Sequence, residues 1–428
     1  MAHYQAAIIF IYLLLSSIIL NFFKLELSAL LLCIFAFVFF LAYLIIYPRI
    51  YPSANQQMIT NAVFLLAIGL MLIARMNVAK AWNQMILIVI SAIVSFLVPY
   101  ILSNGKKYLY KGTWIYGIIG IIALLAVLAG GKEEYGATLG IDLGPVSVQP
   151  SELVKITLVF FVAGMFQVSH SFKRIVVTTM VAALHVLILV ASKDLGAALI
   201  YTIAYIFMLY IATEKFYWVF AGFAATAVAS VGAYFVFHHV RSRVAIWLNP
   251  WADMRGDGWQ IIQSLFGIGT GGWYGMGYTN GMPTLTPIAN KDFIFSALCE
   301  EMGIIFGIGT LLVSLGLLLQ FFWISTWMKQ TFLKIMAFGI AAVYGIQVLI
   351  NVAGVIKLVP LTGITYPLLS YGGSSLLSIF FMLGIMEGLS ILKIREDEEN
   401  EREKEGQAAR QKAAREAEEK AAREWRSW

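Results

Sequence analysis

Long apolar segments separated by short polar connections run along almost the whole chain. A helix needs about 20 mostly apolar residues to cross the hydrocarbon core of a bilayer. Segments that meet this requirement lie at 6–23, 28–47, 58–75, 84–103, 114–130, 151–168, 174–191, 195–212, 216–237, 298–324, 334–356 and 368–391. We therefore expect an all-α polytopic membrane protein whose membrane domain, residues 1–392, contains about twelve transmembrane helices.

The composition agrees with a membrane location. Of the 428 residues, 60% are hydrophobic and only 13% are charged. A soluble domain has about 25% charged residues, so a chain this apolar needs lipid to cover its surface. The net charge of +6 suits an anionic lipid or substrate and does not indicate a nucleic-acid-binding surface.

A group of basic residues in the short connections falls on the same side of the predicted bundle as the charged tail. They are Lys106, Lys107, Lys111, Lys173, Arg174, Lys215 and Lys329. Cytoplasmic loops of membrane proteins carry an excess of Lys and Arg. We therefore expect this side to be cytoplasmic, and with it both termini of the chain.

One connection, residues 238–297, is much longer than the others. Loops of this length are usually functional or disordered. Disorder is not expected here, because aromatic residues are scattered through the segment: Trp247, Trp251, Trp259, Phe266 and Trp273. We expect one large extracellular loop at about 238–297 that packs against the membrane boundary or lines a cavity.

The last 36 residues, 393–428, differ from the rest of the chain. They hold 10 of the 30 Lys and Arg residues and 11 of the 24 Asp and Glu residues. Their Ala, Glu, Lys and Arg content predicts a helix, but they lack apolar heptads. We expect a solvated cytoplasmic tail, and any chemistry must then take place within or at the face of the membrane domain.

Metal-binding and disulfide patterns are not evident in the sequence. Cys33 and Cys299 sit in separate apolar segments, without a CxxC or Cys/His grouping. The five histidines show no metal-ligand spacing. The sequence therefore predicts neither a disulfide framework nor a zinc site.

Charged residues within or beside apolar segments are costly and mark candidate functional positions. Glu152 and Lys155 are three residues apart, so a helix would place them on one face. Asp194 lies in the next outer turn, Asp292 lies near the end of the long loop, and Glu301 follows in the tenth apolar segment. Each alone is compatible with an ion pair that only serves packing, but together they gather around the long loop.

Short motifs occur in a specific order between residues 136 and 387. They are Gly136-Ala137-Thr138-Leu139-Gly140-Ile141, Pro150-Ser151-Glu152-Leu153-Val154-Lys155, Lys193-Asp194-Leu195-Gly196, Trp247-Leu248-Asn249-Pro250-Trp251, Gly256-Asp257-Gly258-Trp259, Asp292-Phe293-Ile294-Phe295, Glu300-Glu301-Met302-Gly303, Pro360-Leu361-Thr362-Gly363-Ile364 and Ser370-Tyr371-Gly372-Gly373-Ser374-Ser375. In this combination the chain resembles the SEDS family (shape, elongation, division and sporulation), the family of RodA, FtsW and SpoVE. Two positions depart from the family pattern: Gly140 replaces a Trp, and Asn290-Lys291 replaces His-Thr or Gln-Thr before the aspartate.

The resemblance implies a function. It implies a multi-pass peptidoglycan glycosyltransferase of the bacterial plasma membrane, which polymerises lipid II for elongation, division or sporulation. It also implies a partner, a class B penicillin-binding protein, which is a single-span transpeptidase. The essential catalytic aspartate of the family falls on Asp292.

The implied reaction needs a base for the acceptor 4-hydroxyl, positive charge for the leaving diphosphate, and an apolar groove. An α-linked donor that gives a β-1,4 product is inverted, so one base suffices. Asp292 is the candidate base, while Arg243, Arg255 and Lys291 are candidates for binding the diphosphate without a metal. Further candidate substrate-binding residues are Glu152, Lys155, Asp194 and Glu301. No cofactor is implied, and a divalent cation is compatible with this chemistry.

Two other classes of protein also fit the pattern. Charges within the membrane would suit a flippase for lipid-linked precursors, although no inverted repeat of short broken spans is apparent. A non-catalytic scaffold for a transpeptidase would tolerate the loss of Asp292. An enzyme needs Asp292 to form polymer, which separates it from both alternatives.

Overall fold

The computed structural model describes residues 2–24, 26–134, 137–142, 147–254, 256 and 258–426. The α-helices are α1 (Ala2–Lys24), α2 (Leu27–Ile50), α3 (Gln56–Met76), α4 (Val78–Leu109), α5 (Thr113–Gly130), α6 (Pro150–Val168), α7 (Phe172–Ala191), α8 (Leu195–Thr213), α9 (Tyr217–Val236), α10 (His238–Leu248), α11 (Gly258–Gly271), α12 (Ile294–Trp327), α13 (Thr331–Val355) and α14 (Gly373–Arg426). The other elements are the 3-10 helices η1 (Pro250–Asp253) and η2 (Pro283–Leu285) and the strands β1 (Lys132–Glu134), β2 (Ala137–Asp142) and β3 (Ser147–Val148).

Twelve helices of the described part of the chain are long and apolar enough to cross a membrane, namely α1–α9 and α12–α14. Each corresponds to one of the predicted apolar segments, so the predicted multi-pass membrane protein with about twelve spans is confirmed. The last span begins at Gly373 and not at residue 368, because residues 366–372 form turns that are bound to other elements.

The predicted all-α fold class is confirmed, and one small non-helical element lies between α5 and α6. Here β1, β2 and β3 form a small antiparallel sheet in the order β1-β2-β3. Its strands have six residues or fewer. Strands this short do not appear in a search for long apolar segments, which explains the difference.

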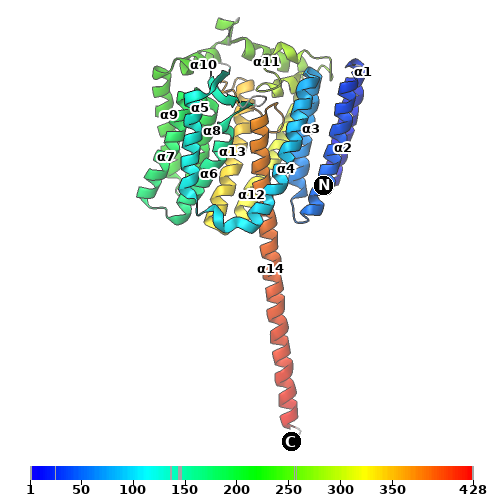
Figure 1. Ribbon diagram of the computed structural model, residues 1–428, viewed down its shortest axis with the longest axis vertical. Coiled ribbons are helices and arrows are strands. Elements are labelled where there is room, and N and C mark those ends of the chain that lie inside the picture. Colours follow the sequence, from blue (N-terminus) through cyan, green and yellow to red (C-terminus); the bar gives the residue numbers. More distant parts are fainter. Residues whose placement is uncertain are drawn as a thin grey trace.

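The long loop is folded and lies across one end of the bundle. It contains α10, η1, α11 and η2, and it ends where α12 begins at Ile294 (Figure 1). Trp247 Nε1 donates to Lys357 O at 3.1 Å, and Ser264 Oγ donates to Val355 O at 3.1 Å. These bonds fasten α11 to the last residue of α13 and α10 to the chain just after it. The extracellular location of this segment stays a prediction.

The tail of α14 lies at the opposite end of the molecule. The helix continues without a break past Lys393 and projects from the bundle as a rod (Figure 1). The predicted helical state of the tail is therefore confirmed, and α14 places that tail far from α10 and α11.

The interior of the bundle is built around α3, α6, α13 and α14, which are largely buried, whereas α9 exposes nearly all of its side chains. An exposed apolar helix in such a bundle faces lipid. Close packing in the interior needs small residues: a Cβ at Gly69 of α3 would collide with the main chain of Leu369. The turns at 366–372 therefore press directly against α3.

Candidate active site

Asp292 lies in the last turn before α12, at the end of the bundle that carries α10 and α11. The residue is half-buried. The N-cap position of α12 belongs to Phe293, and no side-chain cap bond is formed there. The Asp292 carboxylate is therefore not used to cap the helix, which removes the simplest structural role for an acid at this position.

The surroundings make this carboxylate unusually basic. Burial raises the pKa of Asp292 to about 6, and the positive charges of Lys291 and Arg243 partly offset that effect. A general base works best when its pKa lies near the operating pH. At neutral pH the group is mostly ionised and holds more basicity than an ordinary surface aspartate.

Arg243 and Lys291, both predicted as diphosphate-binding residues, lie near Asp292. Arg243 extends from α10, and its Nη1 donates to Leu361 O at 2.6 Å. Arg255, the third predicted basic residue, lies outside the described residues.

Lys193 is a further basic residue near Arg243, and it is not among the binding residues predicted from the sequence. Burial lowers the pKa of His239, and the nearby charges of Arg243, Lys193 and His238 lower it further. Lys193 therefore lies close to the α10 basic residues. Its place in the motif beside Asp194 was the only sequence signal that could have pointed to it.

Glu152 and Lys155 are paired, as their spacing predicts. Lys155 Nζ lies 2.5 Å from Glu152 Oε2 and also donates to Gln347 Oε1 of α13 at 2.8 Å. The Lys155 side chain is only 3% exposed. The pair therefore crosslinks α6 and α13, and neither residue lines the apolar cavity described below.

Asp194 has its carboxylate oxygens occupied by protein groups. Oδ1 accepts from Ala197 N at 3.0 Å and caps α8, while Oδ2 accepts from Ser151 Oγ at 2.9 Å. Burial raises the pKa of Asp194, and these hydrogen bonds oppose the increase. The structure thus places Asp194 in a junction between α6 and α8.

Glu301 lies in a separate buried cluster. Its Oε1 is 3.0 Å from Arg75 Nε of α3, and its side chain is 0% exposed. Arg75 also donates to Thr279 O at 2.8 Å and to Gly281 O at 3.0 Å. The structure therefore joins Glu301 to α3 and to the segment before η2, and not to the Asp292 group.

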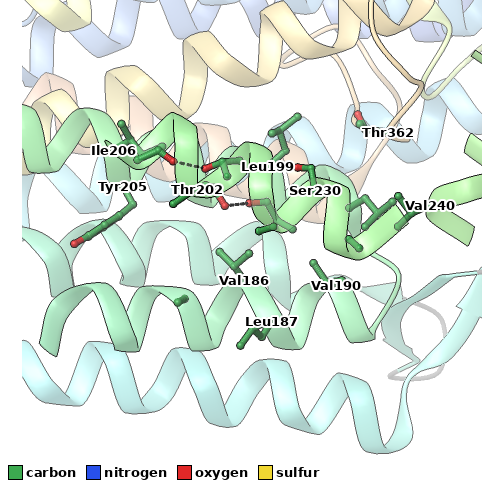
Figure 2. A pocket seen from close by; sticks show the side chains of 18 of the residues that line it. Val186, Leu187, Val190, Leu199, Thr202, Tyr205, Ile206, Ser230, Val240 and Thr362 are labelled. Atoms are coloured by element: carbon green, nitrogen blue, oxygen red, sulfur yellow. Dashed lines mark hydrogen bonds between the residues drawn. The ribbon is translucent and has the colours of Figure 1, made fainter. Parts of the chain in front are cut away.

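An apolar cavity of about 760 Å³ lies between α7, α8 and α9. Figure 2 shows its wall, with Val186 and Val190 of α7 facing Leu199 and Thr202 of α8. Its lining also includes Arg243, Leu361 and Thr362, so one end of the cavity is basic and lies at the α10 side.

Gly363 follows the cavity-lining residue Thr362 in the chain and lies next to Asp292. A methyl group added at Gly363 would lie 3.7 Å from Asp292 Oδ2. The carboxylate thus lies beside the polar end of an apolar cavity, with Arg243 shared between the two. This arrangement suits an amphiphilic, anionic, lipid-linked ligand.

Comparisons with known proteins agree with this chemistry. Residues 26–394 match the family FtsW/RodA/SpoVE, described as "Cell cycle protein". The peptidoglycan glycosyltransferase RodA of Mycobacterium tuberculosis (strain ATCC 25618 / H37Rv) is 33% identical over 370 residues, which is 80% of this chain and 79% of that protein. The peptidoglycan glycosyltransferase MrdB of Escherichia coli (strain K12) is 31% identical over 309 residues, which is 70% of this chain and 81% of that protein.

Solved structures share the fold. One described as "Structural coordination of polymerization and crosslinking by a peptidoglycan synthase complex" matches with a TM-score of 0.67 and 24% identity, covering 80% of this chain and 98% of the other. The rod shape determining protein RodA of Thermus thermophilus matches with a TM-score of 0.59 and 20% identity, covering 79% and 96%. The family match spans most of the chain and includes Asp292 and the helices α7, α8 and α9 that line the cavity. The chain belongs to the FtsW/RodA/SpoVE family of membrane proteins.

Proposed function

We propose that this protein is a peptidoglycan glycosyltransferase that polymerises lipid II into glycan strands. The observation that carries the proposal is the position of Asp292, a basic carboxylate beside Arg243 at the polar end of an apolar cavity. Relatives that are 31–33% identical over most of the chain have names that state this activity.

In the proposed reaction, Asp292 takes the proton from the 4-hydroxyl of the acceptor sugar. The hydroxyl oxygen then bonds to the anomeric carbon of the donor, while the bond from that carbon to the diphosphate breaks. The configuration is inverted in one step, so no covalent sugar–enzyme intermediate is needed. A positioned base contributes about 10²–10⁴-fold to such a step.

Arg243, Arg255 and Lys291 would meet the negative charge of the departing diphosphate. Arg243 is suited to this role, because it lines the cavity and acts electrostatically on Asp292. The apolar cavity between α7 and α9 would hold part of a polyprenyl chain, with the diphosphate at its basic end.

The proposed reaction needs its site on the outer face of the membrane, where lipid-linked precursors are consumed. We place α10 and α11 outside and both termini in the cytoplasm of a bacterial cell, because Lys106, Lys107 and Lys111, Lys173 and Arg174, and the Lys- and Arg-rich tail lie on the opposite side. Residues 1–392 then form the catalytic membrane domain and 393–428 a cytoplasmic tail. A class B penicillin-binding protein is the proposed partner, which agrees with the synthase complex that shares this fold.

Polymerisation of purified lipid II tests the proposal. The full-length protein, with or without a class B partner, should convert lipid II to glycan strands that a muramidase digests. Translocation of lipid II across vesicles without polymer formation would favour a flippase instead. Polymer formation only by an added second glycosyltransferase would favour a scaffold.

A further inference from the structure

The main chain that carries Asp292 is anchored at three consecutive carbonyl groups. The carbonyl of Asn290 accepts from Tyr371 N at 2.8 Å, and that of Lys291 accepts from Ser370 Oγ at 2.5 Å. The Asp292 carbonyl accepts from Asn351 Nδ2 at 2.8 Å. Two of these donors come from the turns at 366–372 and one comes from α13, so elements distant in sequence fix the position of the acid.

Asn351 bridges two main-chain carbonyl groups through its side-chain amide. Its Nδ2 donates to Asp292 O at 2.8 Å and to Ile364 O at 2.6 Å, and the residue is 4% exposed. A rotated amide would turn its oxygen toward two carbonyl oxygens, so these acceptors define which way the group points. Asn351 thus links the main chain of Asp292 to that of Ile364, the residue after Gly363.

The turns that supply Ser370 are themselves held in place. Ser370 Oγ accepts from Tyr366 N at 2.8 Å while it donates to Lys291 O. Gln84 of α4 donates to Ser370 O at 3.2 Å and accepts from Gly372 N at 3.3 Å. Ser370 is therefore a fixed donor within the bundle, and its motif needs no contact with substrate to affect the site.

We propose that Asn351 and Ser370 are positioning residues for Asp292. They hold the main chain of residues 291 and 292 so that the carboxylate stays aimed at the acceptor hydroxyl. This inference rests on the proposed function of Asp292 as the base. A misplacement of about 1 Å costs about 10²-fold in rate, and side chains that support a reacting group are needed to prevent it.

The test measures kcat and KM for lipid II polymerisation per folded molecule. Asn351→Ala, Asn351→Asp and Ser370→Ala should each lower kcat about 10- to 100-fold and leave KM nearly unchanged. Ser370→Thr keeps the hydroxyl and should restore most of the rate. Ser95→Ala is the matched control, because Ser95 Oγ also donates to a main-chain carbonyl, that of Ala92 at 2.6 Å, but within α4.

A double variant separates positioning from folding. Once Asp292→Asn has removed the base, adding Ser370→Ala should not lower the remaining rate further. Near wild-type kcat in Asn351→Ala and Ser370→Ala, with Asp292→Asn inactive, would overturn the inference and keep the proposed function. Equal multiplicative losses with and without Asp292 would also overturn it. An active Asp292→Asn variant would instead reject the base itself, and the inference with it.

Discussion

Arg75 and Glu301 form an ion pair that joins α3 to the first half of α12, with 3.0 Å between Nε and Oε1. Two residues after Glu301, α12 is kinked at Gly303, where φ is +84° and a Cβ would collide with the main chain of Trp273 and Gly275. The Arg75–Glu301 pair therefore fixes the first part of α12, which begins at Ile294, two residues after Asp292, and ends at the kink.

Breaking this pair from one side should destabilise the protein strongly. Arg75→Met leaves the fully buried Glu301 without its charged partner, and such losses cost about 3–5 kcal/mol. The double variant with Glu301→Gln should recover part of this loss, because it removes the buried charge. Thermal unfolding in detergent measures the stability of Arg75→Met, Glu301→Gln and the double variant. Equal stability of the two single variants and the wild type would show that the pair is energetically neutral.

The Glu152–Lys155 pair should be coupled in a double-mutant cycle. Both side chains are largely buried, and Lys155 is also bound by Gln347, so Lys155→Met leaves Glu152 and an amide oxygen without their donor. We expect the effects of Glu152→Gln and Lys155→Met on stability to be non-additive by about 0.5–3 kcal/mol. Strict additivity would mean that the contact contributes nothing.

Filling the apolar cavity should weaken binding of a long polyprenyl chain. Ala229 of α9 lines the cavity, and Ala229→Trp should raise the KM for lipid II with a full-length polyprenyl group more than for an analogue with a short chain. Ala224→Trp is the matched control on the same helix, at an exposed position outside the lining. Equal effects of the two variants on KM would argue against a lipid in this cavity.

The rate should depend on pH through Asp292. Burial raises its pKa to about 6, so the ionised base is lost as the pH falls through that value. We expect kcat/KM, which reports the pKa of the free enzyme, to be nearly constant above pH 7 and to fall about tenfold for each pH unit well below 6. A profile that stays flat down to pH 5 would mean that a different group, or no base, limits the reaction.

The same shift has a consequence for stability. Because the folded-state pKa is raised, the folded protein binds more protons than the unfolded chain between the ordinary aspartate pKa and about 6. Stability therefore decreases as the pH rises through this window, and ionised Asp292 costs stability at neutral pH. Measuring the melting temperature against pH should show a smaller decrease in Asp292→Asn.

Features that depend on local sequence could be predicted well. Every span follows from its apolar length, since only helices with apolar surfaces satisfy a backbone in lipid. The Glu152–Lys155 pair follows from a spacing of three residues on a helix. Both are properties of a single element, so no knowledge of packing is required.

Contacts between distant segments could not be predicted in this way. Asn351 lies 59 residues from Asp292, and Arg75 is even farther from Glu301. Which side chains meet depends on how the helices pack, and apolar periodicity does not encode that choice. The sequence therefore predicts Glu301 as a substrate-binding candidate, whereas the structure pairs it with Arg75. Asp292 itself was singled out through the family resemblance, because a lone acid before a helix resembles an ordinary cap.

The central claim is that the Asp292 carboxylate removes the acceptor proton. Asp292→Asn keeps the volume and the main-chain bond to Asn351 but removes the basic oxygen. The account predicts that purified Asp292→Asn binds lipid II and its partner like the wild type and forms glycan strands at least about 10²-fold more slowly. Polymerisation of lipid II by this variant at the wild-type rate would contradict the account.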